Sequence, residues 1–302
     1  MITPSYLKEG DTVGVVAPAR KIRETEIGDF LRVLENWGLK WRFGNNLFGE
    51  HFIFSGSDED RASDLQAMID DEQIRAVFCA RGGYGSIRTL QHVDFSNFEK
   101  NPKWLIGYSD ITVFHSYINK FTGVESMHGM MPFNNFGNDR NEESLDSLKD
   151  ALFGNKLNYE IKAHPFNIEG SAEGELVGGN LSILNSLNGT VLFPDIKNKI
   201  LFIEEVDEYL YNIDRMMMNL SLSGVFNRAR ALVVGSFTGI KDNEEPFGKN
   251  EYEIIHEITD HYNIPVCFNV PSGHGYTNKT LIFGRKLQLR VGEDHSSLIF
   301  QP

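Results

Sequence analysis

The sequence has few cysteines and few cations. Cys79 and Cys267 are the only two cysteines among 302 residues. They cannot form a disulfide framework, and they supply no CxxC pair for zinc or dithiol redox chemistry. Lys and Arg number 29 against 42 Asp and Glu, which gives a net charge of −13. Nucleic acids and anionic membrane surfaces are bound by clustered cations, so neither is the expected partner.

Long apolar runs and metal-binding motifs are missing as well. The longest apolar runs, such as residues 200–203, are far shorter than the roughly 20 residues that span a bilayer. No basic segment followed by an apolar one opens the chain, so no signal peptide is visible. Glu257 and His261 are one helical turn apart but lack a third ligand. We therefore expect a cytoplasmic protein without a metal or cofactor.

The first half of the chain alternates short apolar runs with amphipathic stretches. The apolar runs predict strands at residues 13–17, 76–80 and 104–107, and residues 40–43 are a further expected strand. Helical spacing predicts helices at residues 22–37, 58–71, 86–93 and 110–121. This alternation predicts an α/β domain whose parallel sheet has helices on both faces. Such sheets bind ligands at the carboxyl ends of their strands.

After about residue 155 the pattern changes to short β-rich runs mixed with helices. The expected strands are residues 173–177, 199–204, 231–236, 281–283 and 287–290, and the expected helices are residues 181–187, 213–222 and 251–261. The pattern predicts a second, α+β domain. We place the domains at residues 1–160 and 170–302, with the linker within residues 164–174.

Ser109 lies between a predicted buried strand and a predicted helix. A serine held on such a turn, beside the free N–H groups of a helix start, resembles a nucleophile elbow, although the G-x-S-x-G pattern is absent. Ser and Asp are also common helix N-caps, so Ser109 or Asp110 could simply cap the helix. Cys79 is a weaker candidate nucleophile, because it lies inside an apolar run where a buried thiol is inert.

Three other features could support a serine nucleophile. The RGGYGS segment at residues 81–86 could direct backbone N–H groups at a negative oxygen, or could be an ordinary turn. His274, flanked by two glycines, could be a general base or a solvated loop residue. Glu204 and Glu205 end an apolar run, and only one of them should face inward, either to orient a histidine or to form a salt bridge.

These features occur within a longer series of motifs. In order they are LKEGDTVGVVAPA, RGGYGS, IGYSDIT, HGM at residues 128–130, VGGNLS, NGT at residues 188–190, ILFIEEVDE, IDR at residues 213–215 and GHG at residues 273–275. The series runs from about residue 7 to residue 290 and resembles the LD-carboxypeptidase family of serine peptidases. That family includes murein tetrapeptide carboxypeptidases and microcin-immunity proteins.

The resemblance implies a flavodoxin-like N-terminal domain and a smaller, swivelling, β-rich C-terminal domain with the catalytic site between them. It implies that Ser109 is the nucleophile, His274 the base and Glu204 the acid that orients it. It further implies an oxyanion hole formed by the backbone N–H groups of Gly83 and Asp110, and a homodimer.

The expected reaction is release of terminal D-alanine from muropeptide tetrapeptides. Arg81 and Tyr108 are candidate substrate-binding residues, with Arg81 the candidate for the terminal carboxylate. An immunity-type hydrolase of aminoacyl-nucleotide toxins and an inactive muropeptide-binding protein are the alternatives. Met130, Glu205 and residues 207–209 depart from the family pattern, which affects the expected substrate preference more than the expected reaction.

Overall fold

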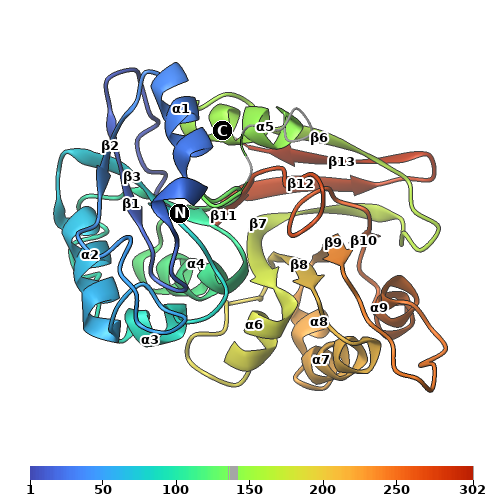
Figure 1. Ribbon diagram of the computed structural model, residues 1–302. Coiled ribbons are helices and arrows are strands. Elements are labelled where there is room, and N and C mark those ends of the chain that lie inside the picture. Colours follow the sequence, from blue (N-terminus) through green and yellow to red (C-terminus); the bar gives the residue numbers. More distant parts are fainter. Residues whose placement is uncertain (135, 137–141, 302) are drawn as a thin grey trace.

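The computed structural model describes residues 1–134, 136 and 142–301. Its strands form a six-stranded sheet in the order β11-β5-β4-β3-β1-β2 and a seven-stranded sheet in the order β10-β9-β8-β7-β12-β13-β6. In Figure 1 the blue and green N-terminal elements lie on the left, and the yellow to orange elements of the second domain lie on the right. The mixed α/β, two-domain fold predicted from the sequence is confirmed.

Five strands of the first sheet run parallel. They are β1 (Thr12–Val16), β2 (Lys40–Phe43), β3 (Ile74–Cys79), β4 (Trp104–Gly107) and β5 (Ser126–His128). Their successive residues alternate between two cores: Phe78 and Ile106 pack on one face, and Val77 and Leu105 on the other. The central strands of the sheet are therefore buried on both sides, as their nearly continuous apolar residues predict, whereas the edge strand β2 is largely exposed.

Helices cover both faces of this sheet. One face carries α1 (Gly28–Asn36) and α5 (Glu142–Phe153), and the other carries α2 (Asp58–Asp70), α3 (Ser86–Leu90) and α4 (Thr112–Tyr117). The first predicted helix is shorter than expected, since a 3-10 turn, η1 (Glu24–Glu26), precedes it and Ile27 at its N-cap lies outside the helical region. The sequence analysis missed β5 and α5.

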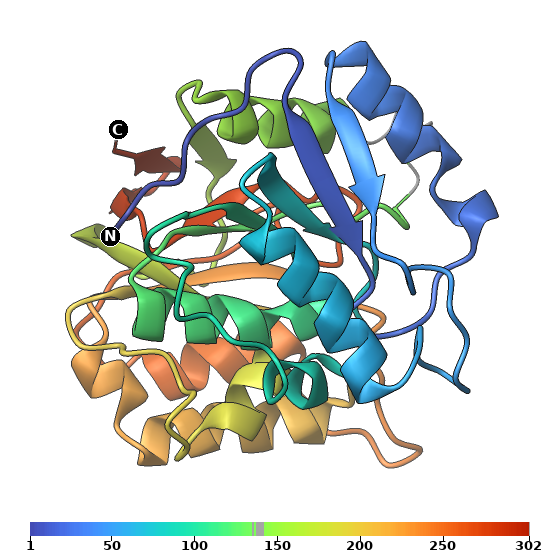
Figure 2. The ribbon, with the colours of Figure 1, turned by 90° about the vertical axis from the view of Figure 1, so that its left-hand side faces the viewer.

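The second sheet is half parallel and half antiparallel. Its parallel strands are β7 (Gly170–Asn180), β8 (Ile200–Val206), β9 (Ala231–Thr238) and β10 (Val266–Cys267), and its antiparallel strands are β6 (Asn158–Lys162), β12 (Lys286–Val291) and β13 (His295–Phe300). The helices α6 (Leu181–Leu187), α7 (Leu210–Leu222), α8 (Val225–Arg228) and α9 (Glu251–Thr259) pack on one face. Figures 1 and 2 show these yellow to orange helices together on the outer side of that sheet.

The chain returns to the first sheet near its end. Strand β11 (Leu281–Phe283) pairs antiparallel with β5, so this segment of the predicted second domain completes the sheet of the first domain. A three-residue apolar strand carries no signal for its partner, which is why the sequence could not place it. Helix α5 fixes the segment that leads into β11, because the Asn278 N–H donates a hydrogen bond to Ser144 Oγ at 2.9 Å. This hydrogen bond holds the loop that contains His274 against the N-terminal domain.

Candidate active site

Ser109 lies directly beyond the carboxyl end of β4, in backbone that L-residues rarely adopt. It begins the 3-10 turn η2 (Ser109–Ile111) with a φ of 64°. A non-glycine residue in this region costs roughly 1–3 kcal/mol and is often found at functional sites. The hydroxyl does not cap the helix, since Tyr108 is the N-cap residue and makes no side-chain cap. The elbow interpretation therefore fits this geometry better than the capping interpretation.

Two glycines allow the turn to form. A Cβ at Gly82 would lie 3.0 Å from Ser109 Cβ and 3.3 Å from its Oγ, so the glycine loop can approach the serine only without a side chain. A Cβ at Gly107 would lie 2.9 Å from Ile111 Cγ1. Gly82 thus permits a close approach of backbone to the hydroxyl, and Gly107 leaves room for the Ile111 side chain that follows the turn.

The backbone N–H groups of Gly83 and Asp110 are available for a ligand. Gly83 has a φ of 104°, and within the described residues neither N–H donates to a protein acceptor. The Asp110 carboxylate has a structural task, because it accepts a hydrogen bond from the Ser86 N–H at the start of α3, at 2.8 Å. Burial raises the pKa of Asp110, an effect that the hydrogen bonds from Ser86 oppose. Both N–H groups remain candidates for an oxyanion hole.

Glu204 and His274 form a directly bonded pair. His274 Nδ1 and Glu204 Oε2 are 2.7 Å apart, and the His274 backbone N–H donates to the same oxygen at 3.2 Å. Glu204 is fully buried near the end of β8, and the His274 side chain is 16% exposed. A carboxylate on Nδ1 keeps the proton there and leaves Nε2 as the acceptor that a general base needs. Burial lowers the pKa of His274, but the charge and hydrogen bond of Glu204 outweigh it and raise the pKa overall.

Glu205 is buried on the opposite side of the strand. It accepts hydrogen bonds from Asn180 Nδ2 at 2.9 Å and from the Ser182 N–H at 2.7 Å, so it anchors the start of α6. The expectation that only one of the two glutamates faces inward is wrong, because β8 is covered on both faces and both carboxylates are buried. Of these two glutamates, Glu204 is the one that hydrogen-bonds to His274.

Tyr108 packs against the base. Its ring lies edge-on to the imidazole of His274, with centroids 4.7 Å apart. Its hydroxyl accepts a hydrogen bond from Asn134 Nδ2 at 3.0 Å, and burial raises the pKa of Tyr108 to about 12. Within the described residues no hydrogen bond joins Ser109 to His274, and the observed link between the two is the ring of Tyr108, the residue before Ser109, which contacts the imidazole. This buried ring shapes the site, a task the sequence analysis did not assign to it.

Arg81 remains a candidate for carboxylate binding. Its side chain is 30% exposed and pairs with Glu26 at 3.4 Å, and its guanidinium lies over the Phe133 ring. Cys79 is fully buried in β3, and burial raises the pKa of its thiol, so it does not present a nucleophile.

The sequence analysis assigned no role to a second histidine close to the site. His128 is fully buried, and neither of its ring nitrogens has a hydrogen-bond partner among the described residues. Its ring lies 5.9 Å from that of Tyr108 and 5.1 Å from that of Phe202. Burial lowers the pKa of His128 well below its usual value, so an uncharged imidazole lies behind Tyr108.

The described part of the chain has neither a membrane-spanning helix nor a cluster of metal-binding side chains. None of its helices is long and apolar enough to cross a bilayer. Three or more His, Cys, Asp or Glu side chains that could share a metal ion were not found in residues 1–134, 136 and 142–301.

Gly273 offers a test of how tightly the pair is packed. It has a φ of 112°, and a Cβ there would lie 2.7 Å from both Glu204 Cβ and Oε2. Gly273→Ala should therefore displace the carboxylate and lower kcat by at least tenfold. Gly10→Ala is the matched control, with a φ of 88° and nothing within 4 Å. Both variants should lose about 1–2 kcal/mol of stability from backbone strain alone. Equal activity of the two variants in a steady-state assay would contradict the packing argument.

Comparison with known proteins identifies the class. The LD-carboxypeptidase N-terminal domain profile matches residues 13–129, and the C-terminal domain profile matches residues 173–289. The protein is therefore a peptidase. It belongs to the LD-carboxypeptidase family, whose members are serine-type carboxypeptidases.

Relatives cover nearly the whole chain. A probable murein peptide carboxypeptidase from Bacillus subtilis is 35% identical over 297 residues, which covers 96% of this chain and 92% of that protein. The murein tetrapeptide carboxypeptidase of Pseudomonas aeruginosa is 29% identical and covers 90% of this chain and 91% of its own length. Among solved structures, the muramoyltetrapeptide carboxypeptidase of Oxalobacter formigenes has a TM-score of 0.88 at 26% identity and covers 96% of this chain and 99% of its own. The microcin C7 self immunity protein MccF shares the fold, with a TM-score of 0.85 at 23% identity, covering 99% of this chain and 98% of its own.

Proposed function

We propose that the protein is a cytoplasmic carboxypeptidase that hydrolyses the L,D-peptide bond before the terminal D-alanine of muropeptide tetrapeptides. The observation that carries this proposal is the buried Glu204–His274 pair, whose imidazole contacts Tyr108, the residue before a serine with a φ of 64°. The substrate class is supported by relatives named as murein peptide and murein tetrapeptide carboxypeptidases. Homodimer formation is proposed from the family resemblance alone.

The proposed first step is acylation of Ser109. Its Oγ attacks the carbonyl carbon while its proton passes to His274 Nε2, and Glu204 stabilises the imidazolium that results. The N–H groups of Gly83 and Asp110 donate to the oxyanion of the tetrahedral intermediate. The C–N bond then breaks, His274 gives its proton to the leaving amine, and D-alanine departs.

The second step is hydrolysis of the acyl-enzyme. A water molecule attacks the ester carbon and gives its proton to His274, and collapse of the second intermediate returns that proton to Ser109 Oγ. The product is a tripeptide with a new carboxylate. His274 must be neutral to accept a proton in each step, so its pKa controls the acid side of the pH profile.

The test is mass spectrometry of a muropeptide tetrapeptide incubated with the protein. We expect the peptide to lose the mass of one alanine with the wild-type protein and to stay intact with Ser109→Ala. Loss of alanine with both proteins would remove Ser109 as the nucleophile. No loss with either would remove the tetrapeptide as the substrate.

An aminoacyl-nucleotide hydrolase is the second candidate. The same three side chains would cleave the bond to an amino acid, and a solved MccF structure is described as a complex with aspartyl sulfamoyl adenosine. At 23% identity that likeness supports the fold only. Turnover of an aminoacyl-nucleotide by a protein that leaves the tetrapeptide intact would favour this candidate.

A further inference from the structure

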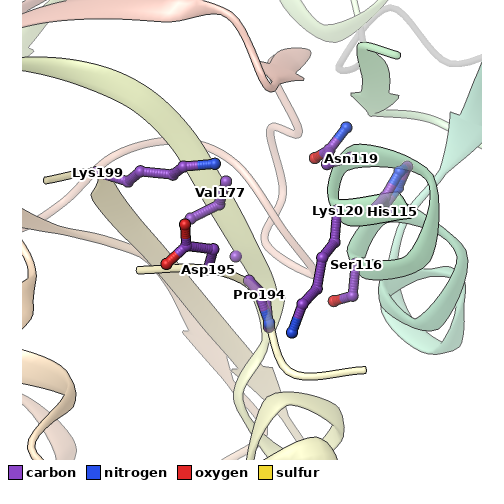
Figure 3. A pocket seen from close by; sticks show the side chains of 9 residues that line it. His115, Ser116, Asn119, Lys120, Val177, Pro194, Asp195 and Lys199 are labelled. Atoms are coloured by element: carbon purple, nitrogen blue, oxygen red, sulfur yellow. The ribbon is translucent and has the colours of Figure 1, made fainter. Parts of the chain in front are cut away.

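A groove of about 700 Å³ opens between the two domains, away from the residues described above. One wall of the groove comes from the π-helical turn η3 (Ile118–Thr122), which continues α4, and the other comes mainly from the segment between α6 and β8. The groove ends in a small pocket of about 10 Å³, which helix α4 itself lines. The residues that line both are Asn119, Lys120, Pro194, Asp195 and Lys199. Figure 3 shows the two walls facing each other.

The groove lies at the far ends of the two elements that carry the proposed catalytic residues. Ser109 precedes α4, whereas Lys120 lies in the turn that follows it. Lys199 immediately precedes β8, whereas Glu204 lies near its end. At 1.5 Å per helical residue and 3.3 Å per strand residue, each separation is about 16 Å. A ligand in the groove would therefore not contact the proposed catalytic residues.

The groove is cationic in a chain with a net charge of −13. The charged side chains that line it are Lys120, Lys199, Arg228 and Asp195. Lys120 Nζ donates one hydrogen bond, to the Phe193 carbonyl at 2.9 Å, and has two further N–H groups. Lys199 pairs with Glu175 at 2.9 Å, and Arg228 is exposed with no ion pair among the described residues. Local cations of this kind attract an anion despite the overall negative field.

Ser116 supplies an independent sign of a missing ligand. Its side chain is buried, its Oγ has no hydrogen-bond partner among the described residues, and it lines the small pocket. In Figure 3 the Ser116 oxygen points from α4 toward the wall that carries Pro194. A buried hydroxyl is costly unless it is hydrogen-bonded. The small pocket has room for about one water-sized atom, so a single ligand oxygen would fill it.

We propose that this groove binds a phosphate-bearing small molecule. One phosphate oxygen accepts a hydrogen bond from Ser116 in the small pocket and another accepts from Lys120, while the charge of Lys199 on the opposite wall attracts the anion. A phosphate carries up to two negative charges and several strong acceptor oxygens, which suits these donors better than a singly charged carboxylate does. The remaining volume of the groove, toward Arg228, accommodates an organic group of ordinary ligand size.

The test is isothermal titration calorimetry in phosphate-free buffer, with inorganic phosphate and glycerol 3-phosphate as probes and acetate at matched ionic strength as the reference. We expect saturable binding of the phosphate probes and none of acetate. Lys120→Met, which keeps the stem, should weaken binding by about tenfold or more, since charge-assisted hydrogen bonds are the strong ones. Ser116→Ala should weaken binding severalfold. Lys100→Met, an exposed lysine outside the groove, is the matched control and should change nothing.

Three outcomes would contradict the proposed phosphate site. They are no saturable binding heat with either phosphate probe, equal binding of acetate, and an equal loss of phosphate affinity in Lys100→Met and Lys120→Met. If Lys120→Met fails to fold, Arg228→Gln at the exposed end takes its place, and glycerol 3-phosphate should bind it more weakly. Tighter binding of the ester than of inorganic phosphate identifies a phosphomonoester as the ligand, and equal affinity identifies free phosphate. The assay needs no substrate, so its result is independent of the proposed peptidase activity.

Discussion

Replacing Ser109 with alanine should lower kcat for release of the terminal residue by about 10⁴-fold or more, with the fold intact. Loss of a nucleophile from a serine–histidine–acid site leaves only the residual rate due to oxyanion stabilisation and substrate binding. Alanine retains the Cβ, so the turn at φ 64° is unchanged. Steady-state rates on a muropeptide tetrapeptide, together with circular dichroism of both proteins, give the measurement.

Two companion variants sharpen this prediction. Ser109→Gly should be as inactive as Ser109→Ala but more stable by about 1 kcal/mol in urea unfolding, because glycine adopts positive φ without strain. Ser63→Ala removes an exposed serine hydroxyl on α2 and should retain full activity. If Ser109→Ala keeps more than a tenth of the wild-type kcat, another group is the nucleophile.

The framework of the first domain follows from its sequence. All four predicted strands of the first half are present as β1 to β4, and three of them, β1, β3 and β4, are apolar runs bounded by glycine, proline or charged residues. The position of Ser109 at a strand end follows from the same pattern. Its φ of 64° does not, since hydrophobic periodicity carries no information on the backbone angles of a turn residue.

Contacts between distant segments could not be predicted. Glu205 accepts hydrogen bonds from Asn180 and Ser182, which lie more than twenty positions earlier in the chain. The sequence around Glu205 does not indicate these partners. The packing of Tyr108 on His274 likewise depends on the crossing of β11 into the first sheet. The choice of Glu204 over Glu205 came from the family motif, and the structure places Glu204 on His274.

Glu204→Gln should lower kcat by about 10³- to 10⁴-fold, the second-largest effect expected. The carboxylate can only accept a hydrogen bond, which keeps the His274 proton on Nδ1. An amide can present its NH₂ group to Nδ1, which favours the tautomer protonated on Nε2, and that tautomer cannot take the Ser109 proton. Glu204 is fully buried, so no water would replace the lost interaction. Steady-state kinetics on the same tetrapeptide measures the loss.

The pH profile separates this effect from simple destabilisation. His274 must be neutral to act as a base, so kcat/KM falls as the pH drops through its pKa. Glu204 raises that pKa above 6.5, and therefore the acid limb of the wild-type profile should lie above pH 6.5. Removing the charge lowers the pKa of His274, so the residual activity of Glu204→Gln should persist to lower pH than that of the wild type.

Glu205→Gln is the matched control for this shift. Its carboxylate is equally buried, but it bonds to Asn180 and Ser182, and its charge has a smaller effect on the pKa of His274 than that of Glu204. We expect Glu205→Gln to unfold more easily, with an acid limb close to that of the wild type. Equal losses of kcat and equal shifts of the limb in the two variants would mean that the buried charge near the base matters and the hydrogen bond to Nδ1 does not.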